Sequence, residues 1–547
     1  MNFMRNETAE KLRGGYYTPQ DLALFLARWV AQGKPNSILE PSCGDGAFLD
    51  AIAKADVGRA KVVAIELDAV EAAKSTERTR NLAIDAEVLN RDFLGWALDE
   101  LPKGGQRFDA VVGNPPFVRY QYLPPTFQGL AEKVFSSLSC RFTKHTNAWV
   151  PFVLASVALL KPGGRLAMVV PAEIIHVLHA QSLRTFLGEA CRRLVIIDPE
   201  EIWFEDTLQG AVLLMAEKKR RPSDATEGLG LVPVRGRGFL DEDPATLFAR
   251  PVPINGRTVE GKWTRAFLDV AVRELLDELE ELPIVHRFSD VADVDVGIVT
   301  GANKFFLVRD ETVEAFGLEQ WSHPMFGRSE HCPGVIYDAR QHRANGKGGL
   351  PSNFLWFPDE AAGKDPKVAA YIALGEKQEL HTRYKCRIRK PWYAVPSVYA
   401  TEIGMLKRSH DAPRLILNKV GAYTTDTAYR VRSRGISAET LVGAFVNPLT
   451  ALSAELEGRT YGGGVLELVP SEIERLLIPV PADGVVDVRA LDRAVRTTSM
   501  QDILSDHGAK VLAGIGLTEA KSEALTDAWS QLRNRRQRIG GTEEDEA

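Results

Sequence analysis

The first residues that could do chemistry are Asn114, Pro115, Pro116 and Phe117, which directly follow the apolar run 108–113. This run is β-branched and apolar enough to predict a buried strand. The Pro-Pro pair cannot continue a helix or a sheet ladder, so the chain must turn there. Open α/β sheets bind their ligands at the carboxyl ends of strands. The turn, which carries an amide and an aromatic ring, therefore predicts the edge of an active site.

Glycines and acids follow the three strands that we expect before this turn. Gly44 and Gly46, in the stretch LEPSCGDGAF, allow a tight turn whose backbone amides can approach a ligand. Glu66 ends the next strand, where an acid binds ribose hydroxyls. Asp92 and Phe93 end the third, with an acceptor for an adenine amino group and a ring to stack on it. Each acid alone is more often a helix N-cap, but three successive strand ends predict a nucleoside pocket.

The stretches LEPSCGDGAF, AIELD, NRDF and NPPF, in this order, resemble S-adenosylmethionine-dependent amino-methyltransferases, specifically the DNA adenine methyltransferases of restriction–modification systems. The segment GGYYTPQDLALFLARWV resembles the one that precedes the glycine loop in that family. The short interval before NPPF and the long region after it match the gamma class. The resemblance covers residues 14–220 and implies S-adenosylmethionine as cofactor. The implied cofactor-binding residues are Tyr17, Thr18, Glu40, Ser42, Gly44, Gly46, Glu66, Asp92, Phe93 and Asn114.

The NPPF residues suit methyl transfer to a planar amine. The lone pair of adenine's amine is delocalised into the ring, and two acceptors on its hydrogens make the nitrogen more electron-rich during attack. We expect the amide oxygen of Asn114 and the carbonyl of Pro115 to be these acceptors, and Phe117 to stack on a base flipped out of the duplex. The resemblance implies a second stacking aromatic, Phe204. The alternatives are a mere turn for NPPF and plain core packing for Phe204.

Alternating strand-like and helical runs over the first 220 residues must position these groups. The alternation predicts an α/β fold with a parallel sheet and helices on both faces, and the resemblance implies a Rossmann-like, seven-stranded methyltransferase domain. The pattern stops near Gly228, after a polar stretch. We expect a catalytic domain over 1–225, a connector over 226–284, a mixed α+β target-recognition domain over 285–490, and a helical C-terminal segment with an acidic tail over 491–547.

The net charge of −6 does not by itself indicate a protein that binds nucleic acid, but lysines and arginines cluster in the second half of the chain. They form the clusters RYKCRIRK (383–390), YRVRSR (429–434) and RNRRQR (533–538), with tyrosines and a tryptophan among and near them. Any one cluster could be a solvated face. Together they favour a phosphate-binding surface. The stretch DVGIVTGANKFFLV resembles the opening of the family's recognition domain. Candidate DNA-binding residues are Lys304, Arg389, Lys390, Lys419, Arg459 and Tyr461.

Several classes of protein are disfavoured by what the sequence lacks. The N-terminal residues have no apolar run typical of a signal peptide, and no stretch approaches a membrane span. The five cysteines show no CxxC pairing, which fits a reducing cytoplasm and predicts no metal site. No nuclease motif is evident. We therefore expect a cytoplasmic monomer that acts on double-stranded DNA, with any cognate restriction endonuclease a separate protein.

The resulting hypothesis is a sequence-specific DNA adenine-N6 methyltransferase. NPPF also marks enzymes that methylate a protein glutamine or guanine in RNA, but the long carboxyl-terminal region favours DNA. Transfer to the cytosine amine or to RNA stays open, because the same acceptors serve those amines. A catalytically inactive DNA-specificity protein is the third alternative, and the presence of Asn114, Pro115, Glu66 and Asp92 argues against it.

Overall fold

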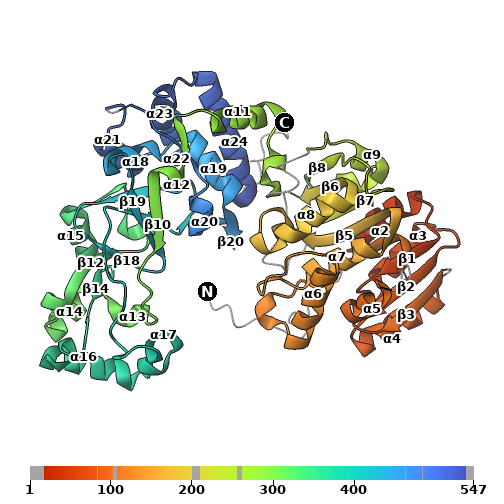
Figure 1. The fold of residues 1–547 in the computed structure, drawn as a ribbon, viewed down its shortest axis with the longest axis horizontal. Helices are drawn as coiled ribbons and strands as arrows, with labels where there is room; N and C mark the ends of the chain where they lie inside the picture. Colours follow the sequence, from red (N-terminus) through yellow and green to blue (C-terminus); the bar gives the residue numbers. More distant parts are fainter. Residues whose placement is uncertain are drawn as a thin grey trace, which may run out of the picture. The chain divides into compact units, whose positions relative to one another are not determined.

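A computed structural model describes residues 18–82, 84–102, 107–199, 210–254, 262–461, 464–482 and 484–537. Two of the predicted site residues, Tyr17 and Phe204, lie outside these ranges. The chain divides between Phe267 and Leu268 into two compact units, which we call the first and second unit. Figure 1 shows the helices and strands of both units.

The first unit is built on one eight-stranded sheet of order β3-β2-β1-β4-β5-β7-β6-β8. Its pairs are parallel except where β7 runs antiparallel to both β5 and β6. The predicted α/β fold is thus confirmed, with one strand reversed and an eighth added. The strands are β1 (Ser37–Glu40), β2 (Lys61–Glu66), β3 (Asp85–Asn90), β4 (Phe108–Gly113), β5 (Leu160–Pro171), β6 (Cys191–Pro199), β7 (Ala211–Lys218) and β8 (Gly228–Val234).

Helices cover both faces of this sheet. Because side chains alternate along a strand, Leu166 and Met168 of β5 point into one apolar cluster and Ala167 and Val169 into the other. Residues of α5–α8 pack into the first cluster, and residues of α2, α3 and α9 into the second. The helices are α2 (Gln20–Gln32), α3 (Ala47–Lys54), α4 (Ala69–Arg80), α5 (Phe93–Glu100), α6 (Pro125–Ser137), α7 (Trp149–Leu159), α8 (Gln181–Ala190) and α9 (Pro244–Ala249).

The first unit extends further along the chain than the predicted boundary at 225. Strand β8 pairs with β6 in parallel over seven residue pairs, from Arg193–Gly228 to Pro199–Val234. Helix α9 contributes Leu247 and Phe248 to the apolar cluster beneath the sheet. Because β8 contains two glycines and a proline, its sequence is typical of a linker, and the predicted boundary lies before it. The segment is a strand because it pairs with β6 at the edge of the sheet.

The described residues of the second unit form four small sheets, of orders β10-β19-β15-β17-β13, β11-β14-β12-β18, β16-β21-β20 and β22-β9. Short strands between short helices agree with the mixed α+β fold expected here. The strands are β9 (Val285–Arg287), β10 (Ala292–Val296), β11 (Leu307–Val308), β12 (Ser322–Phe326), β13 (Ile336–Tyr337), β14 (Asn353–Leu355), β15 (Ile403–Leu406), β16 (Arg408–Ser409), β17 (Leu415–Asn418), β18 (Tyr423–Thr424), β19 (Ala428–Ser433), β20 (Arg459–Tyr461), β21 (Val465–Glu467) and β22 (Leu477–Pro479).

Helices surround these sheets, and none among the described residues is long and apolar enough to cross a membrane. They are α11 (Val270–Glu280), α12 (Phe288–Val291), α13 (Asn303–Phe306), α14 (Asp310–Phe316), α15 (Ala339–Lys347), α16 (Pro366–Lys377), α17 (Tyr384–Arg387), α18 (Ala438–Ala444), α19 (Pro448–Glu457), α20 (Pro470–Ile473), α21 (Val488–Val495), α22 (Met500–Ile503), α23 (Ala509–Ala513) and α24 (Glu519–Gln537).

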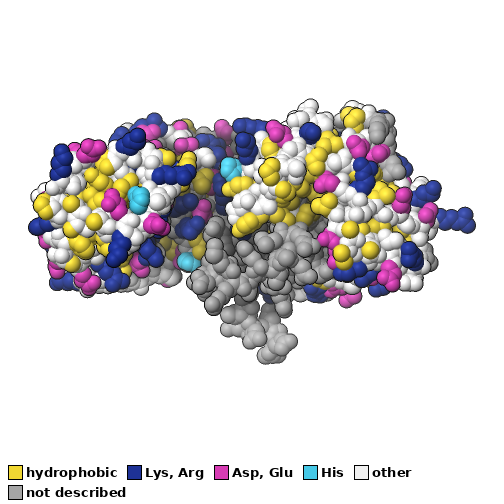
Figure 2. Space-filling model, turned by 90° about the horizontal axis from the view of Figure 1, so that it is seen from below, with side chains coloured by type: hydrophobic (Ala, Val, Ile, Leu, Met, Phe, Trp, Pro, Cys, Tyr) yellow, Lys and Arg dark blue, Asp and Glu magenta, His cyan; other side chains and the backbone are white. Residues whose placement is uncertain are grey.

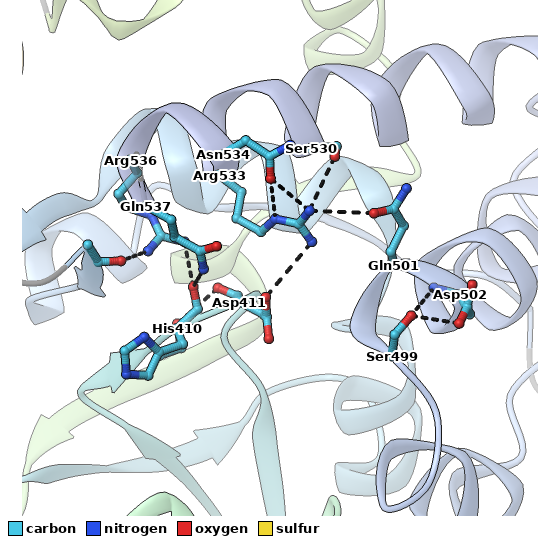
Figure 3. Close-up of polar contacts among 12 residues, drawn as sticks. His410, Asp411, Ser499, Gln501, Asp502, Ser530, Arg533, Asn534, Arg536 and Gln537 are labelled. Carbon is cyan, nitrogen blue, oxygen red and sulfur yellow. Dashed lines mark hydrogen bonds and ion pairs between the residues drawn. The ribbon is translucent and has the colours of Figure 1, made fainter. Parts of the chain in front are cut away.

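The last helix, α24, is held in the second unit by its arginines. Arg536 is buried and pairs with Glu455 of α19 at 2.8 Å, and it also donates to the carbonyl of His410 at 2.7 Å. Arg533 lies over the ring of Trp529. Its guanidinium group is also 3.8 Å from the carboxylate of Asp411 (Figure 3). Two arginines of the RNRRQR cluster therefore anchor the helix.

Candidate active site

The predicted site residues gather where the carboxyl ends of β1 and β4 lie side by side. The two strands pair in parallel, so the loop after β1 and the NPPF turn after β4 are neighbours. The Ser42 hydroxyl donates to the main-chain carbonyl of Asn114 at 3.0 Å. A Cβ added at Gly113 would lie 3.2 Å from Cδ of Pro41. The sheet thus brings together the predicted cofactor loop and the predicted catalytic turn.

The amide of Asn114 is oriented by Thr18. Asn114 Nδ2 donates to Thr18 Oγ1 at 3.1 Å, and Thr18 is a buried residue just before α2. Because the amide nitrogen points toward Thr18, the amide oxygen of Asn114 points away from it. That oxygen is the atom that the predicted chemistry needs as an acceptor. Thr18 was predicted as a cofactor residue, and the structure adds a contact with the amide of Asn114, which was predicted to be catalytic.

Hydrogen bonds from β2 and α4 hold the glycine loop. Gly44 and Gly46 have left-handed φ values of 51° and 95°, which glycine adopts without strain. Glu66 accepts from the backbone N–H of Gly44 at 2.9 Å and from that of Asp68 at 2.8 Å. The Ser75 hydroxyl donates to the carbonyl of Gly44 at 2.7 Å. Glu66 therefore shapes the loop, and its predicted contact with a ribose stays a prediction.

Glu40, at the end of β1, is a buried carboxyl group with capacity for a ligand. Its side chain is 1% exposed, and its Oε2 has no hydrogen-bond partner among the described residues. Burial, and after it the nearby carboxylates of Glu66 and Asp45, raises the pKa of Glu40 well above its usual range. A cationic ligand would relieve this cost, since it would pair with the ionised carboxylate.

Asp92 and Phe93 both have structural contacts. Asp92 caps α5 by accepting from the N–H of Gly95 at 2.8 Å. This is the helix N-cap role that was the alternative for each acid at a strand end. It also lines an open cavity of about 420 Å³. Phe93 is 3% exposed, and its ring centroid is 4.9 Å from that of Phe152. Their adenine contacts stay predictions.

Phe117 follows the two prolines, and its partly buried side chain packs against the apolar clusters on both faces of the sheet. The backbone beyond it is tied to the start of α7. Asn147 accepts from the N–H of Tyr120 through Oδ1 at 3.0 Å, and the N–H of Ala148 donates to the carbonyl of Val118 at 2.9 Å. These two hydrogen bonds fix the direction in which the chain leaves the NPPF turn, and this segment is called the NPPF exit below.

A buried acid that sequence reasoning missed supports this exit. Glu173, just after β5, accepts from Asn147 Nδ2 and from Trp149 Nε1, both at 2.7 Å, and lies 3.8 Å from His179 Nε2. Burial alone would raise the pKa of Glu173, but His179 and these two donors outweigh burial and hold the pKa below its usual value. The donors Asn147 and Trp149 lie in the stretch HTNAWV, and Glu173 lies in PAEIIH. No rule of sequence spacing connects these two stretches, so the contact could not be predicted.

We expect Glu173→Ala to lower the rate of methyl transfer about tenfold, because a displaced turn misplaces the acceptors, and a 1 Å error can cost roughly 100-fold. Glu173→Gln keeps an acceptor oxygen and should retain most activity. Cofactor affinity should change little in both variants, because Glu173 contacts neither the glycine loop nor Glu40. Single-turnover rates and calorimetry measure the two effects. Equal rates for wild type and Glu173→Ala would contradict the role.

The candidate DNA-binding residues of the second unit differ in their contacts. Lys419 pairs with Glu439, and Arg459 donates to the buried Glu472 at 2.9 Å. Arg389 donates to backbone carbonyls at 299 and 300. Lys304 and Lys390 are exposed and have no ion pair among the described residues, and Tyr461 belongs to β20. Their DNA contacts stay predictions.

The sheet carries a glycine loop after β1, an acid after β2 and NPPF after β4, which agrees with the class that the sequence resemblance implied, the S-adenosylmethionine-dependent methyltransferases. Comparison with known families gives the same class. Residues 2–229 match the family described as N-6 DNA Methylase, and residues 260–512 match the C-terminal domain of type II methyltransferase M.Eco57I. The N-terminal part of the chain is therefore similar to N-6 DNA methylases, and the C-terminal part is similar to the corresponding domain of a type II methyltransferase.

Curated relatives match over both units. Type II methyltransferase M.AccI of Acinetobacter calcoaceticus is 22% identical over 479 residues, covering 84% of each chain. M.XamI of Xanthomonas campestris pv. amaranthicola is 24% identical over 484 residues, covering 85% of each. M.TthHB8I of Thermus thermophilus is 30% identical over 186 residues, which cover 33% of this chain and 39% of that protein.

Proposed function

We propose that this protein is a site-specific DNA methyltransferase that transfers a methyl group from S-adenosylmethionine to the N6 amine of a flipped adenine in double-stranded DNA. The observation that carries the proposal is the position of Asn114. Its amide nitrogen is held by Thr18 and its carbonyl by Ser42, directly beside the glycine loop. The activity would take place in the cytoplasm and protect DNA from a cognate restriction endonuclease, a separate protein.

The described residues fit S-adenosylmethionine. This cofactor is a cation that carries an ammonium group and supplies a methyl group on a sulfonium. Glu40 supports this assignment, because its buried carboxyl group has an Oε2 that no described donor satisfies. Glu66, which also holds the glycine loop through the N–H of Gly44, would bind the ribose hydroxyls of the nucleoside.

The remaining chemistry falls to the NPPF residues. Asn114 Oδ1 and the carbonyl of Pro115 would accept the two hydrogens of the amine, which keeps its lone pair out of the ring. Neither group has to ionise. Phe117 would support the base by stacking. No basic side chain is required beside the amine, since the proton can leave after transfer.

Mapping modified bases tests this proposal. The chain alone is expressed in a bacterial host that lacks its own adenine methylation, and the host DNA is sequenced by a method that detects N6-methyladenine and N4-methylcytosine. Methylated adenine at one defined site supports the proposal. Methylated cytosine establishes the alternative amine. Unmodified DNA, together with a purified protein that binds S-adenosylmethionine, would overturn it.

We expect Phe117→Ala to weaken binding of the flipped base by about 1–3 kcal/mol, the typical contribution of one stacked base. Phe117→Tyr keeps an aromatic face and should retain most activity. A mismatch opposite the target base lowers the cost of unpairing, so it should partly restore binding by Phe117→Ala. Duplexes with 2-aminopurine at the target position report extrusion by fluorescence. Identical affinity, rate and fluorescence for wild type and Phe117→Ala would exclude stacking on Phe117.

A further inference from the structure

In two of the three basic clusters of the second unit, one arginine is used by the fold itself. In the cluster 429–434, Arg430 is buried and donates to the carbonyls of Ser397 at 2.8 Å and Val296 at 2.7 Å. In the cluster 533–538, Arg536 pairs with the buried Glu455. These arginines are not available to a ligand, because breaking their bonds would leave buried groups unsatisfied.

The third cluster, at α17, faces solvent. Arg383, Lys385, Arg387 and Lys390 are exposed, and none has an ion pair among the described residues. Two large hydrophobic side chains stand among them: Tyr384 is 63% exposed and Ile388 is 62% exposed. They are four residues apart, so over one helical turn they lie on the same side. Exposed hydrophobic side chains that adjoin one another can form part of a contact surface.

The backbone beneath this cluster is firmly held. Arg389 donates to the carbonyl of Thr300 at 2.7 Å and to that of Val299 at 2.6 Å. A Cβ added at Gly301 would lie 2.7 Å from Cβ of Lys385, so the two segments are in direct contact. The exposed side chains around α17 are therefore carried by a rigid base, which lowers the entropy cost of binding.

The charge of this region identifies the chemistry of its partner. Residues 380–401 contain five lysines and arginines and no aspartate or glutamate, in a chain whose net charge is −6. In Figure 2, which shows the second unit from the end that carries α16 and α17, Lys and Arg side chains lie beside hydrophobic ones. Closely spaced cations around an exposed aromatic ring suit a polyanion that also offers apolar faces. Nucleic acid has this combination.

We propose that this α17 surface, defined as Arg383, Tyr384, Lys385, Arg387, Ile388 and Lys390, contacts the DNA duplex that contains the target adenine. The cations contact phosphates, and Tyr384 and Ile388 lie against sugars and base edges in a groove. The inference rests on the proposed function and adds to it the element that holds the duplex.

The charge contribution is tested with Lys385→Gln combined with Arg387→Gln in the full-length protein. Affinity for a duplex should fall about tenfold, and to a similar extent on specific and non-specific sequences. Each phosphate contact adds about 0.9 to the slope of log affinity against log salt concentration, so the slope should decrease by about 2. The melting temperature and the affinity for S-adenosylmethionine should not change.

The matched control is Arg489→Gln combined with Arg493→Gln. It removes the same charge from exposed arginines of α21, at the opposite end of the second unit from α17 (Figure 1). This control should retain both the affinity and the salt slope of the wild type. An equal loss in both double variants would mean that only net charge matters, and it would overturn the proposal.

The hydrophobic pair is tested by Tyr384→Ala combined with Ile388→Ala. We expect the ratio of specific to non-specific affinity to fall about tenfold, with the salt slope preserved, because no phosphate contact is removed. An unchanged ratio would overturn the assignment of this pair. If wild-type protein binds and methylates DNA while both α17 variants behave as wild type, the α17 inference fails and the proposed function stands. If wild-type protein modifies no DNA, the proposed function itself fails.

Discussion

We expect Asn114→Ala to lower the rate of methyl transfer by about 100-fold or more, the typical cost of removing one oriented polar group at a reacting centre. The loss should appear in single-turnover experiments at saturating S-adenosylmethionine. Cofactor affinity should stay within about threefold of wild type, because Glu66 and Ser75 hold the glycine loop, and the hydrogen bond that Asn114 accepts from this loop uses its main-chain carbonyl, which the substitution keeps. A single-turnover rate within tenfold of the wild-type value would exclude the proposed role.

Thr18 offers a matched pair of variants for the same prediction. Thr18→Ser keeps the hydroxyl that accepts from Asn114 Nδ2, whereas Thr18→Val removes it at nearly the same volume. Only the valine variant should lose activity, by about tenfold, because the amide of Asn114 then loses the bond that orients it. Equal rates for the two Thr18 variants would show that this hydrogen bond does not position the amide.

The second large effect is expected at Glu40, where Glu40→Gln should weaken S-adenosylmethionine binding by about tenfold or more. A glutamine has nearly the same shape as glutamate, but it is neutral and therefore cannot form an ion pair with a cation; hydrogen bonds to charged groups contribute about 1.5–3 kcal/mol. Isothermal titration calorimetry measures the loss. Unchanged affinity would show that the cationic part of the cofactor binds elsewhere.

The same substitution should stabilise the ligand-free protein at neutral pH. The folded state raises the pKa of Glu40, so its contribution to stability is fully present below the unfolded pKa of about 4.3 and is lost as pH rises through the folded pKa. Glu40→Gln avoids this loss. Its melting temperature should therefore exceed that of wild type at pH 7, and the difference should vanish as the pH approaches 4.

Glu455→Gln is the control for this stability gain. Glu455 is also a buried carboxyl group with a raised pKa, but it pairs with the buried Arg536. Removing its charge leaves that guanidinium without its counterion, so the control should be destabilised. A lower melting temperature for both variants would mean that Glu40 has a counterion in the folded protein.

Periodicity along the first 220 residues was sufficient to predict the parallel-rich sheet. Strands buried on both faces read as continuous apolar runs, and this signal is local. It could not show that β7 is reversed, because an antiparallel strand in the same layer has the same apolar pattern. Nor could it show that β8 belongs to the sheet, because Gly228, Gly230 and Pro233 read as a linker until they pair with β6.

For the active site, the amino-acid sequence by itself determined which groups are present and the strand ends where they lie: the amide and ring of NPPF, the two loop glycines and the acids after the strands. Only the tertiary structure decided their contacts. It joined Thr18 to Asn114 across 96 residues and brought Glu173 beneath the NPPF exit. It also separated exposed cations at α17 from arginines buried elsewhere. Such pairings depend on which distant segments pack together, and no local spacing records that.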